Sequence, residues 1–217
     1  MRIYRKYIAI LLMLLPLLGI AQTRGIDVSK YQGSINWSKV AKTGKVKYVY
    51  IKSTEGTTIQ DPYYKRNIDG ARKAGLLVGS YHIYSSKTTA YQQWDNFKNV
   101  VKKDKQDLIP VLDIEERHSR NLYMARVDKI LELMEKEYGV KPMIYTSERV
   151  YFAHFANKKY KDYQIFVANY CRYPRCRFTL WQYTQTGRIS GISGAVDFSE
   201  MHQHKDLEDI KLPKKKD

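Results

Sequence analysis

The sequence has very few cysteines and, beyond its first twenty residues, no long apolar run. Its two cysteines, Cys171 and Cys176, have four residues between them, none of them histidine or acidic, so this loop alone lacks the ligands of a structural zinc site. No stretch after residue 21 is apolar for long enough to cross a bilayer. These absences argue against a metal-stabilised fold and against an integral membrane protein.

The N-terminus has the three parts of a secretory signal peptide. Three basic residues among the first six precede an apolar run over 8–20, and the small residues Gly19 and Ala21 have the spacing found before a cleavage site. Pro16 interrupts the run, which is short for a membrane anchor. We therefore predict cleavage near Ala21 and a secreted or periplasmic protein with no transmembrane span. In an oxidising compartment the two cysteines are expected to form a disulfide rather than a metal site.

Acidic residues are also scarce relative to basic ones. The chain has 22 Asp and Glu against 38 Lys and Arg, and removal of residues 1–21 lowers the net charge only from +16 to +13. Such an excess favours polyanions, among them nucleic acid, anionic lipid and acidic cell-wall polymers. The sequence contains no recognisable nucleic-acid-binding module, and export separates the protein from nucleic acid. We therefore expect anionic wall polymers, and no nucleic acid, as partners.

An apolar run leads directly into acidic residues at 108–116, Leu-Ile-Pro-Val-Leu-Asp-Ile-Glu-Glu. The run is typical of a strand buried on both faces, as in a parallel sheet. Asp113 and Glu115 are two positions apart, so on a strand they point the same way, while Ile114 points back into the packing. Two carboxylates held together in a partly apolar site retain one proton near neutral pH, as general acid catalysis on an acetal requires. An isolated pair of this kind is more often a solvated strand end.

Strands and helices alternate five times along the chain. Strands are expected at 25–27, 47–52, 76–84, 108–116, 143–145 and 164–168. Helices are expected at 36–42, from Asp61-Pro62 to Gly75, from a cap at Thr88 or Thr89 to Val101, at 121–138 and at 147–155. Two final strands, 179–183 and 195–198, are joined by a glycine-rich connection over 186–194. With 217 residues, the pattern predicts one domain, a parallel α/β, TIM-like barrel of eight strands with an incomplete ring of about five helices.

Two of these helices have a predicted core face. One carries apolar residues at three- and four-residue spacing, Tyr91, Trp94, Phe97 and Val101; the other carries Leu122, Ile130, Leu133 and Met134. The barrel is expected to span 22–205 and to be followed by a basic tail over 206–217.

Functional groups of such barrels gather at the C-terminal ends of the strands. The residues at or near those ends are acidic, aromatic or polar: Asp27, Tyr81, His82, Asp113, Glu115, Tyr145, Trp181, Gln182 and Asp197. Together they describe a sugar-binding cleft. His82 is expected to hydrogen-bond a carboxylate, because no other histidine completes a metal set: His118, His154, His202 and His204 look like surface or packing residues. We therefore expect neither a metal nor a cofactor.

The chain resembles the glycoside hydrolase family 25 lysozymes, the Chalaropsis-type N-acetylmuramidases, over roughly residues 24–201. The likeness rests on blocks in the right order: Gly25-Ile-Asp-Val-Ser-Lys-Tyr-Gln-Gly33, Lys52-Ser-Thr-Glu-Gly56, Asp61-Pro62 through Gly70-Ala71 to Gly79-Ser-Tyr-His82, Pro110-Val-Leu-Asp-Ile-Glu115, Trp181-Gln-Tyr183 and Val196-Asp197. Departures at Ser199, where many relatives have Asn, and at Ile83, where many have an aromatic residue, affect the rim of the cleft and leave substrate preference open.

The resemblance implies a monomeric enzyme without cofactor that hydrolyses the β-1,4 bond from N-acetylmuramic acid to N-acetylglucosamine in peptidoglycan. It implies that Glu115 is the general acid, and that Asp113, Asp27 and Asp197 orient the substrate N-acetyl group or stabilise positive charge. The residues expected to contact substrate are Tyr81, His82, Tyr145, Trp181, Gln182 and Glu55. Spacing alone leaves a retaining and an inverting mechanism open, whereas participation of the substrate acetamido group predicts retention.

Two other functions are compatible with part of this pattern. A barrel glycosidase acting on chitin also carries an Asp-x-Glu after its fourth strand, but the blocks around Asp27, Trp181 and Asp197 argue against it. A non-catalytic glycan-binding protein on a decayed barrel would be expected to have lost an acid, and none of the four carboxylates is missing.

Overall fold

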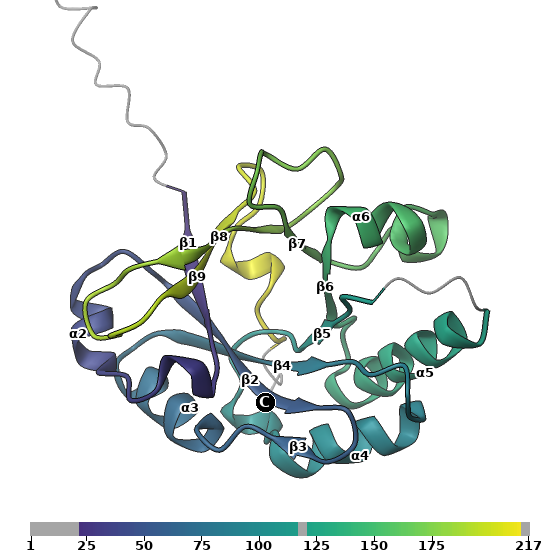
Figure 1. The fold of residues 1–217 in the computed structure, drawn as a ribbon, viewed down its shortest axis with the longest axis horizontal. Coiled ribbons are helices and arrows are strands. Elements are labelled where there is room, and N and C mark those ends of the chain that lie inside the picture. The colour runs from purple at the N-terminus through teal and green to yellow at the C-terminus, as the bar shows by residue number, and fades with distance from the viewer. Residues whose placement is uncertain (1–21, 117–120, 214–217) are drawn as a thin grey trace, which may run out of the picture.

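The computed structural model describes residues 22–116 and 121–213 (Figure 1). The predicted signal peptide with its cleavage near Ala21, His118 and the last four residues of the expected tail lie outside the described residues.

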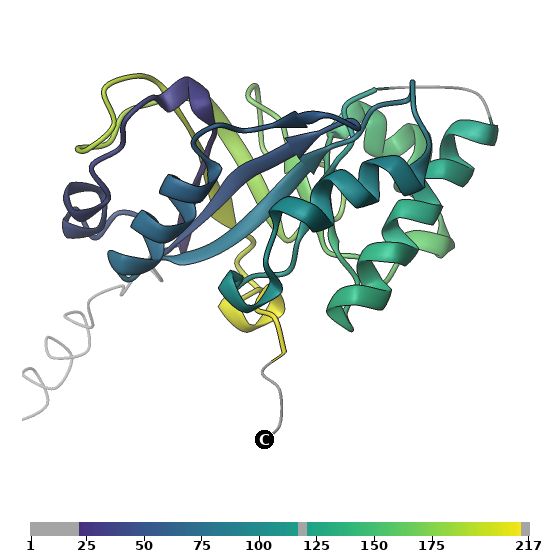
Figure 2. The same cartoon turned by 90° about the horizontal axis from the view of Figure 1, so that it is seen from below.

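Eight strands close into a barrel (Figures 1 and 2). They are β1 (Arg24–Val28), β2 (Tyr48–Glu55), β4 (Leu77–Ile83), β5 (Val111–Asp113), β6 (Met143–Ser147), β7 (Ile165–Ala168), β8 (Leu180–Gly187) and β9 (Val196–Met201). Their order around the barrel is β1-β9-β8-β7-β6-β5-β4-β2, and pairing of β1 with β2 closes the ring. The predicted barrel of eight strands is confirmed. A short strand that was not predicted, β3 (Ile59–Gln60), pairs antiparallel with the end of β2 outside the ring.

The prediction that the barrel is wholly parallel is wrong for its last strand. β9 runs antiparallel to both of its neighbours, β8 and β1. The connection from β8 to β9 covers only residues 188–195, and a parallel crossover needs a dozen or more residues. The reversal has a consequence for function. The start of β9 lies at the same mouth as the ends of the parallel strands, so Asp197 pairs in register with Asp27 of β1.

Five α-helices lie in the described chain, as predicted: α2 (Trp37–Lys42), α3 (Tyr64–Lys73), α4 (Ala90–Val100), α5 (Asn121–Tyr138) and α6 (Glu148–Val150), which continues as a π-helical turn (Tyr151–Phe155). Side chains of Asn36, Thr89 and Ser147 cap α2, α4 and α6 by accepting backbone N–H groups. α3 begins later than predicted, because the Asp61 carboxylate accepts the backbone N–H groups of Lys30 and Tyr63 and so forms a turn before the helix.

The predicted core faces are correct except in the first turn of each helix. Trp94, Phe97 and Val101 are buried, as are Ile130 and Met134, and Leu133 is partly buried. Tyr91 and Leu122 are exposed instead. Helical periodicity places a side chain on one face, but whether that face meets another element depends on tertiary structure.

The C-terminal segment closes the barrel end opposite the mouth. Ile109 donates its backbone N–H to Ile210, whose side chain is fully buried among residues of the barrel interior. A short 3-10 helix (Leu207–Asp209) precedes Ile210. The expected boundary at 205 is therefore too early, because residues that were assigned to a basic tail pack into the fold.

Candidate active site

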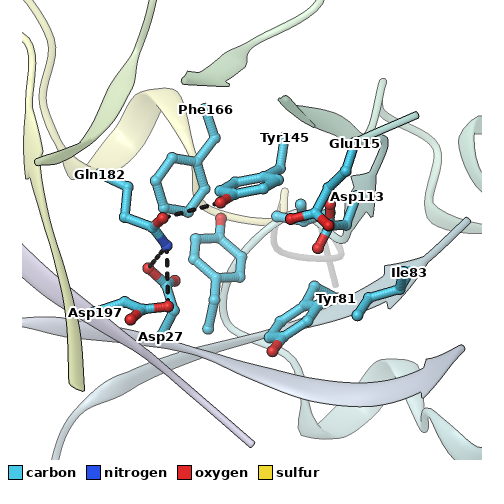
Figure 3. Close-up of a pocket in the computed structure, with 11 residues that line it drawn as sticks. Asp27, Tyr81, Ile83, Asp113, Glu115, Tyr145, Phe166, Gln182 and Asp197 are labelled. Atoms are coloured by element: carbon cyan, nitrogen blue, oxygen red, sulfur yellow. Dashed lines mark hydrogen bonds between the residues drawn. The ribbon is translucent and has the colours of Figure 1, made fainter. Parts of the chain in front are cut away.

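A pocket of about 130 Å³ lies at the mouth of the barrel (Figure 3). Its lining consists of Asp27, Tyr50, Tyr81, Ile83, Val111, Asp113, Glu115, Tyr145, Phe166, Gln182 and Asp197. The structure thus brings together the four carboxylates that the sequence analysis assigned to catalysis, from β1, from β9 and from the end of β5 and the residues after it. It also places Tyr81, Tyr145 and Gln182 beside them.

The end of β5 positions the acid pair. β5 stops at Asp113, and one further backbone hydrogen bond joins the Ile114 N–H to the carbonyl of Tyr145 on β6. Alternation holds through this point: Asp113 is buried in the pocket, Ile114 is fully buried in the outer core, and Glu115 is exposed at the rim. The strand is shorter than expected because Ile109 pairs with the C-terminal segment.

Asp113 is buried, and no described residue donates a hydrogen bond to its carboxyl group. Its Oδ1 atom has no hydrogen-bond partner in the described part of the chain. Burial raises the pKa of Asp113 well above its usual value, the charge of Glu115 raises it further, and the charge of Lys52 opposes both. Burial also raises the pKa of Glu115, again against Lys52. Both carboxyl groups therefore hold protons to higher pH than free carboxyl groups do, and the exposed one, Glu115, is accessible to a ligand.

Gln182 connects the other two acids to the tyrosines of the site. Its Nε2 donates to Oδ2 of Asp27 (3.1 Å) and to Oδ2 of Asp197 (3.4 Å). Its Oε1 accepts from the hydroxyls of Tyr145 (2.9 Å) and Tyr170 (2.5 Å). Because carboxylates face one end of the amide and hydroxyl donors face the other, the network fixes the amide orientation (Figure 3).

The pair formed by Asp27 and Asp197 is also short of protein donors. Burial, and then the charge of Asp197, raise the pKa of Asp27 well above its usual value, against the hydrogen bond from Gln182. Burial and the charge of Glu115 raise the pKa of Asp197 to about 6. Oδ1 of Asp27 is buried and has no partner in the described residues. Polar atoms left in this state in a pocket are available to a ligand.

Two residues that were predicted to contact substrate face the other way. His82 follows Tyr81 on β4 and is fully buried in the outer layer: its Nδ1 lies 2.7 Å from Oγ1 of Thr54, and its Nε2 lies 3.3 Å from Oε1 of Gln93. Burial lowers the pKa of His82 to about 4, so the ring is neutral at physiological pH. The prediction that His82 hydrogen-bonds a carboxylate is therefore wrong, since its partners Thr54 and Gln93 are both uncharged.

Trp181 likewise points out of the barrel while its neighbour Gln182 points in. Its Nε1 donates to the backbone carbonyl of Asn169 (2.8 Å), and its ring contacts Tyr173 and Tyr183. Adjacent strand residues alternate between the two faces, so one residue of the pair Tyr81–His82 and one of the pair Trp181–Gln182 had to be excluded from the cleft. The sequence analysis used this alternation for Asp113 and Glu115, and the same alternation holds for the pairs Tyr81–His82 and Trp181–Gln182.

Glu55 lies beside the pocket lining rather than in it. Its Oε2 pairs with the ammonium of Lys52 at 2.6 Å, and the Lys52 side chain is only 9% exposed. The charges of both residues act on the pKa of Asp113 and of Glu115. The sequence analysis did not single out Lys52, although a lysine among the apolar and hydroxyl-bearing residues 48–54 of β2 is the signal that could have found it.

Three aromatic residues of the site were also missed. Tyr50 and Phe166 line the pocket, and Tyr170 joins the network of Gln182. The alternation of β2 could have placed Tyr50 inside the barrel, whereas Tyr170 follows β7 in a loop whose path no local pattern predicts.

The two cysteines do not form the expected disulfide in the structure. Both are free thiols, with Cys171 exposed and Cys176 partly buried. Burial raises the pKa of Cys176 to about 11, which keeps it a thiol and disfavours oxidation. The loop is held by other means: Glu148 accepts the backbone N–H of Arg175 and pairs with Arg172.

The described residues 22–116 and 121–213 contain no group of three or more histidine, cysteine, aspartate or glutamate side chains that could hold a metal ion. In the same ranges, no helix has both the length and the apolar character needed to cross a membrane.

Comparison with known proteins identifies the family. Residues 26–192 match the family described as Glycosyl hydrolases family 25. The uncharacterized protein YegX of Escherichia coli K12 is 36% identical over 187 residues, which cover 81% of this chain and 68% of that protein. The autolytic lysozyme of Clostridium acetobutylicum is 30% identical over 185 residues, 83% of this chain and 56% of that protein. A family 25 glycosyl hydrolase from Bacillus anthracis has a similar structure, with a TM-score of 0.77 at 28% identity over 86% of this chain and 91% of that one.

The chain belongs to Glycosyl hydrolases family 25 and is a glycosidase.

Proposed function

We propose that this glycosidase is a lysozyme that cleaves the β-1,4 bond between N-acetylmuramic acid and N-acetylglucosamine in peptidoglycan. The observation that carries the proposal is the acid pair at the mouth: exposed Glu115 has a raised pKa, and buried Asp113 beside it has no donor among the described residues. The similarity to a protein named autolytic lysozyme supports this choice of substrate.

In the proposed mechanism Glu115 is the general acid. It gives its proton to the glycosidic oxygen as the bond to the muramic acid carbon breaks, and later removes a proton from the attacking water. The raised pKa keeps the carboxyl group protonated closer to neutral pH, where its acid form is needed. No described residue donates a hydrogen bond to the Glu115 side chain, so within the described ranges no protein donor competes with the substrate for it.

The nucleophile in this proposal belongs to the substrate. The carbonyl oxygen of the 2-acetamido group attacks the anomeric carbon, and the unpartnered Oδ1 of Asp113 accepts the amide N–H and so orients the group. Because two displacements follow one another at the same carbon, the configuration is retained without a covalent bond to the enzyme.

Asp27, Asp197 and Gln182 form the other wall of the pocket. We propose that the negative charge of the Asp27–Asp197 pair stabilises the positive charge that develops on the sugar ring. Gln182 holds both carboxyl groups in place. Tyr81 and Tyr145 remain protonated, because burial raises the pKa of both phenols well above the usual value. Their hydroxyl groups can therefore donate to sugar oxygens or to Gln182.

We also propose that the protein acts outside the cytoplasm and that its positive surface binds anionic wall polymers. Charges on an exposed surface are screened over about 10 Å at 0.1 M salt. Raising the salt concentration should therefore lower binding to, and activity on, whole walls, while cleavage of a short soluble glycan changes little. Equal salt sensitivity on both substrates would exclude this role for the surface.

The proposed function is tested by the ends that the enzyme creates. The protein without residues 1–21 is incubated with purified peptidoglycan, and the new reducing ends are reduced and identified by mass spectrometry. Muramic acid ends are expected. N-acetylglucosamine ends, or equal turnover of chitin oligosaccharides, would indicate a different glycosidase. Binding to the wall without new ends would indicate a glycan-binding protein. Glu115→Gln from the same preparation is the control for contaminating hydrolases.

A further inference from the structure

A second pocket of about 430 Å³ adjoins the first and shares two of its residues. Glu115 and Tyr145 line both pockets. The other lining residues come from the ends of β6 and β7 and the segments that follow them: Ser147, Glu148, Arg149, Ala168, Asn169 and Tyr170. A glycan bound at Glu115 therefore has open space on this side for a substituent.

Arg149 is the one cationic residue in the described lining of the two pockets. It is exposed, and no described residue forms a hydrogen bond or an ion pair with its guanidinium group. All four charged side chains in the described lining of the first pocket are carboxylates, which would repel a carboxylate on the substrate. An anionic group is therefore disfavoured in the first pocket.

Glu148 does not cancel the charge of Arg149. Its carboxylate is occupied by other partners: Asn169 Nδ2 (2.6 Å), the Arg175 backbone N–H (2.6 Å) and Arg172 (2.8 Å). These bonds use both oxygens of Glu148 and hold the far wall of the second pocket in place. Arg149 remains with its donors available to a ligand.

We propose that the second pocket binds a carboxylate carried by the substrate, with Arg149 as its partner. The inference rests on the proposed function, which supplies such a group in two forms. Muramic acid without a peptide has a free lactyl carboxylate, whereas in muramic acid with a stem peptide the lactyl group is an amide and the carboxylates lie on the peptide. Arginine matches either form, because its planar donors bind a carboxylate through two parallel hydrogen bonds.

The test compares substrate pairs that differ only in charge. One pair is a short soluble peptidoglycan oligosaccharide without peptides and its carboxyl methyl ester. The other pair carries stem peptides with free or esterified carboxyl groups. KM and kcat are measured for the wild type, Arg149→Gln, Arg149→Lys and Lys98→Gln, which removes one charge from an exposed site on α4, outside both pockets.

For at least one pair, esterification should raise the wild-type KM about fivefold and leave kcat nearly unchanged, as expected for loss of a charge-assisted pair at an exposed site. The ratio of KM for the ester to KM for the free acid should fall close to one in Arg149→Gln. It should recover in part in Arg149→Lys and should equal the wild-type ratio in Lys98→Gln. The substrate pair whose KM rises on esterification shows whether Arg149 binds the lactyl carboxylate or a peptide carboxylate.

A wild-type ratio near one for both pairs, or a ratio that Arg149→Gln leaves unchanged, would overturn the inference while the proposed function stands. Failure of the wild type to cleave any of the four substrates would instead refute the proposed function, and the inference with it. Thermal unfolding of each variant, compared with that of Lys98→Gln, separates a folding defect from a change in recognition.

Discussion

Two buried carboxylates on neighbouring strands of the barrel have opposite surroundings. Asp113 at the end of β5 and Glu148 just after β6 are 6% and 8% exposed. Oδ1 of Asp113 receives no hydrogen bond from any described residue, and the pKa of Asp113 is raised, first by burial and then by the charge of Glu115. Burial also acts to raise the pKa of Glu148, but the hydrogen bonds from Arg175, Arg172 and Asn169 outweigh it, and the pKa is lowered.

The two carboxylates differ in their donors: described groups donate to both oxygens of Glu148, whereas Oδ1 of Asp113 has no donor among the described residues. A carboxylate whose oxygens are all occupied stabilises the loop that it binds, whereas one left without donors costs stability and is available to a substrate. We therefore expect changes at the mouth to alter activity, and changes at Glu148 to alter mainly stability.

The largest expected effect is on activity at the mouth. Glu115→Gln should lower kcat on soluble peptidoglycan fragments by about 10² to 10⁴-fold, because the amide cannot supply an acidic proton. Its unfolding midpoint should be no lower than that of the wild type, since the side chain makes no hydrogen bond to a described residue and burial raises its pKa. Turnover close to the wild-type value would remove Glu115 from the role of acid.

The opposite result is expected at the structural carboxylate. Glu148→Gln should lower the free energy of unfolding by about 1 to 3 kcal/mol, because an amide nitrogen would face the donors of Asn169 and Arg172. Denaturant unfolding measures this loss. A variant as stable as the wild type would show that the hydrogen bonds of Glu148 do not hold the loop, and the contrast with Asp113 would fail.

Asp113→Asn sharpens the comparison through pH. The folded pKa of Asp113 lies above its unfolded value, so the folded state binds the proton more tightly. The resulting contribution to stability is complete below the unfolded pKa and is lost as pH rises through the folded pKa. At pH 8 the variant should therefore be more stable than the wild type by on the order of 1 kcal/mol, and the advantage should shrink toward pH 4.

The control for this measurement is Asp95→Asn, at an exposed position on α4. It should show no pH-dependent gain. If Asp113→Asn were equally destabilising at both pH values, the buried carboxylate would have an unrecognised partner.

The smallest effect is expected at Lys52, whose charge lowers the pKa of both Asp113 and Glu115. Lys52→Met removes that charge, so Glu115 should keep its proton to higher pH. The alkaline limb of the pH profile of kcat/KM should then move to higher pH, while Lys52→Arg should leave the limb near its wild-type position. A shift to lower pH in Lys52→Met would contradict the electrostatic role.

Much of the barrel could be predicted because its signals are local. Apolar strands, helix caps and the acids after β5 are all visible over fewer than ten residues, and the four carboxylates meet as strand ends of one barrel must. The antiparallel course of β9 followed from the length of the connection before it, which the sequence already showed.

The outward direction of His82 and Trp181 follows from alternation once the inward neighbour is known.

The remaining features depend on contacts between distant segments. The path of the loop that carries Tyr170, and the packing of Ile210 under the barrel, are set by partners far away in the chain. No pattern within either segment contains that information.

The most direct test of the proposed mechanism is time-resolved NMR of the first product that the enzyme releases from a soluble peptidoglycan fragment. The new reducing end should be muramic acid in the β configuration, before mutarotation, because the substrate acetamido group, oriented by Asp113, takes the place of an enzyme nucleophile. Initial release of the α-anomer would contradict this account and would make Asp113, Asp27 or Asp197 the base that activates water.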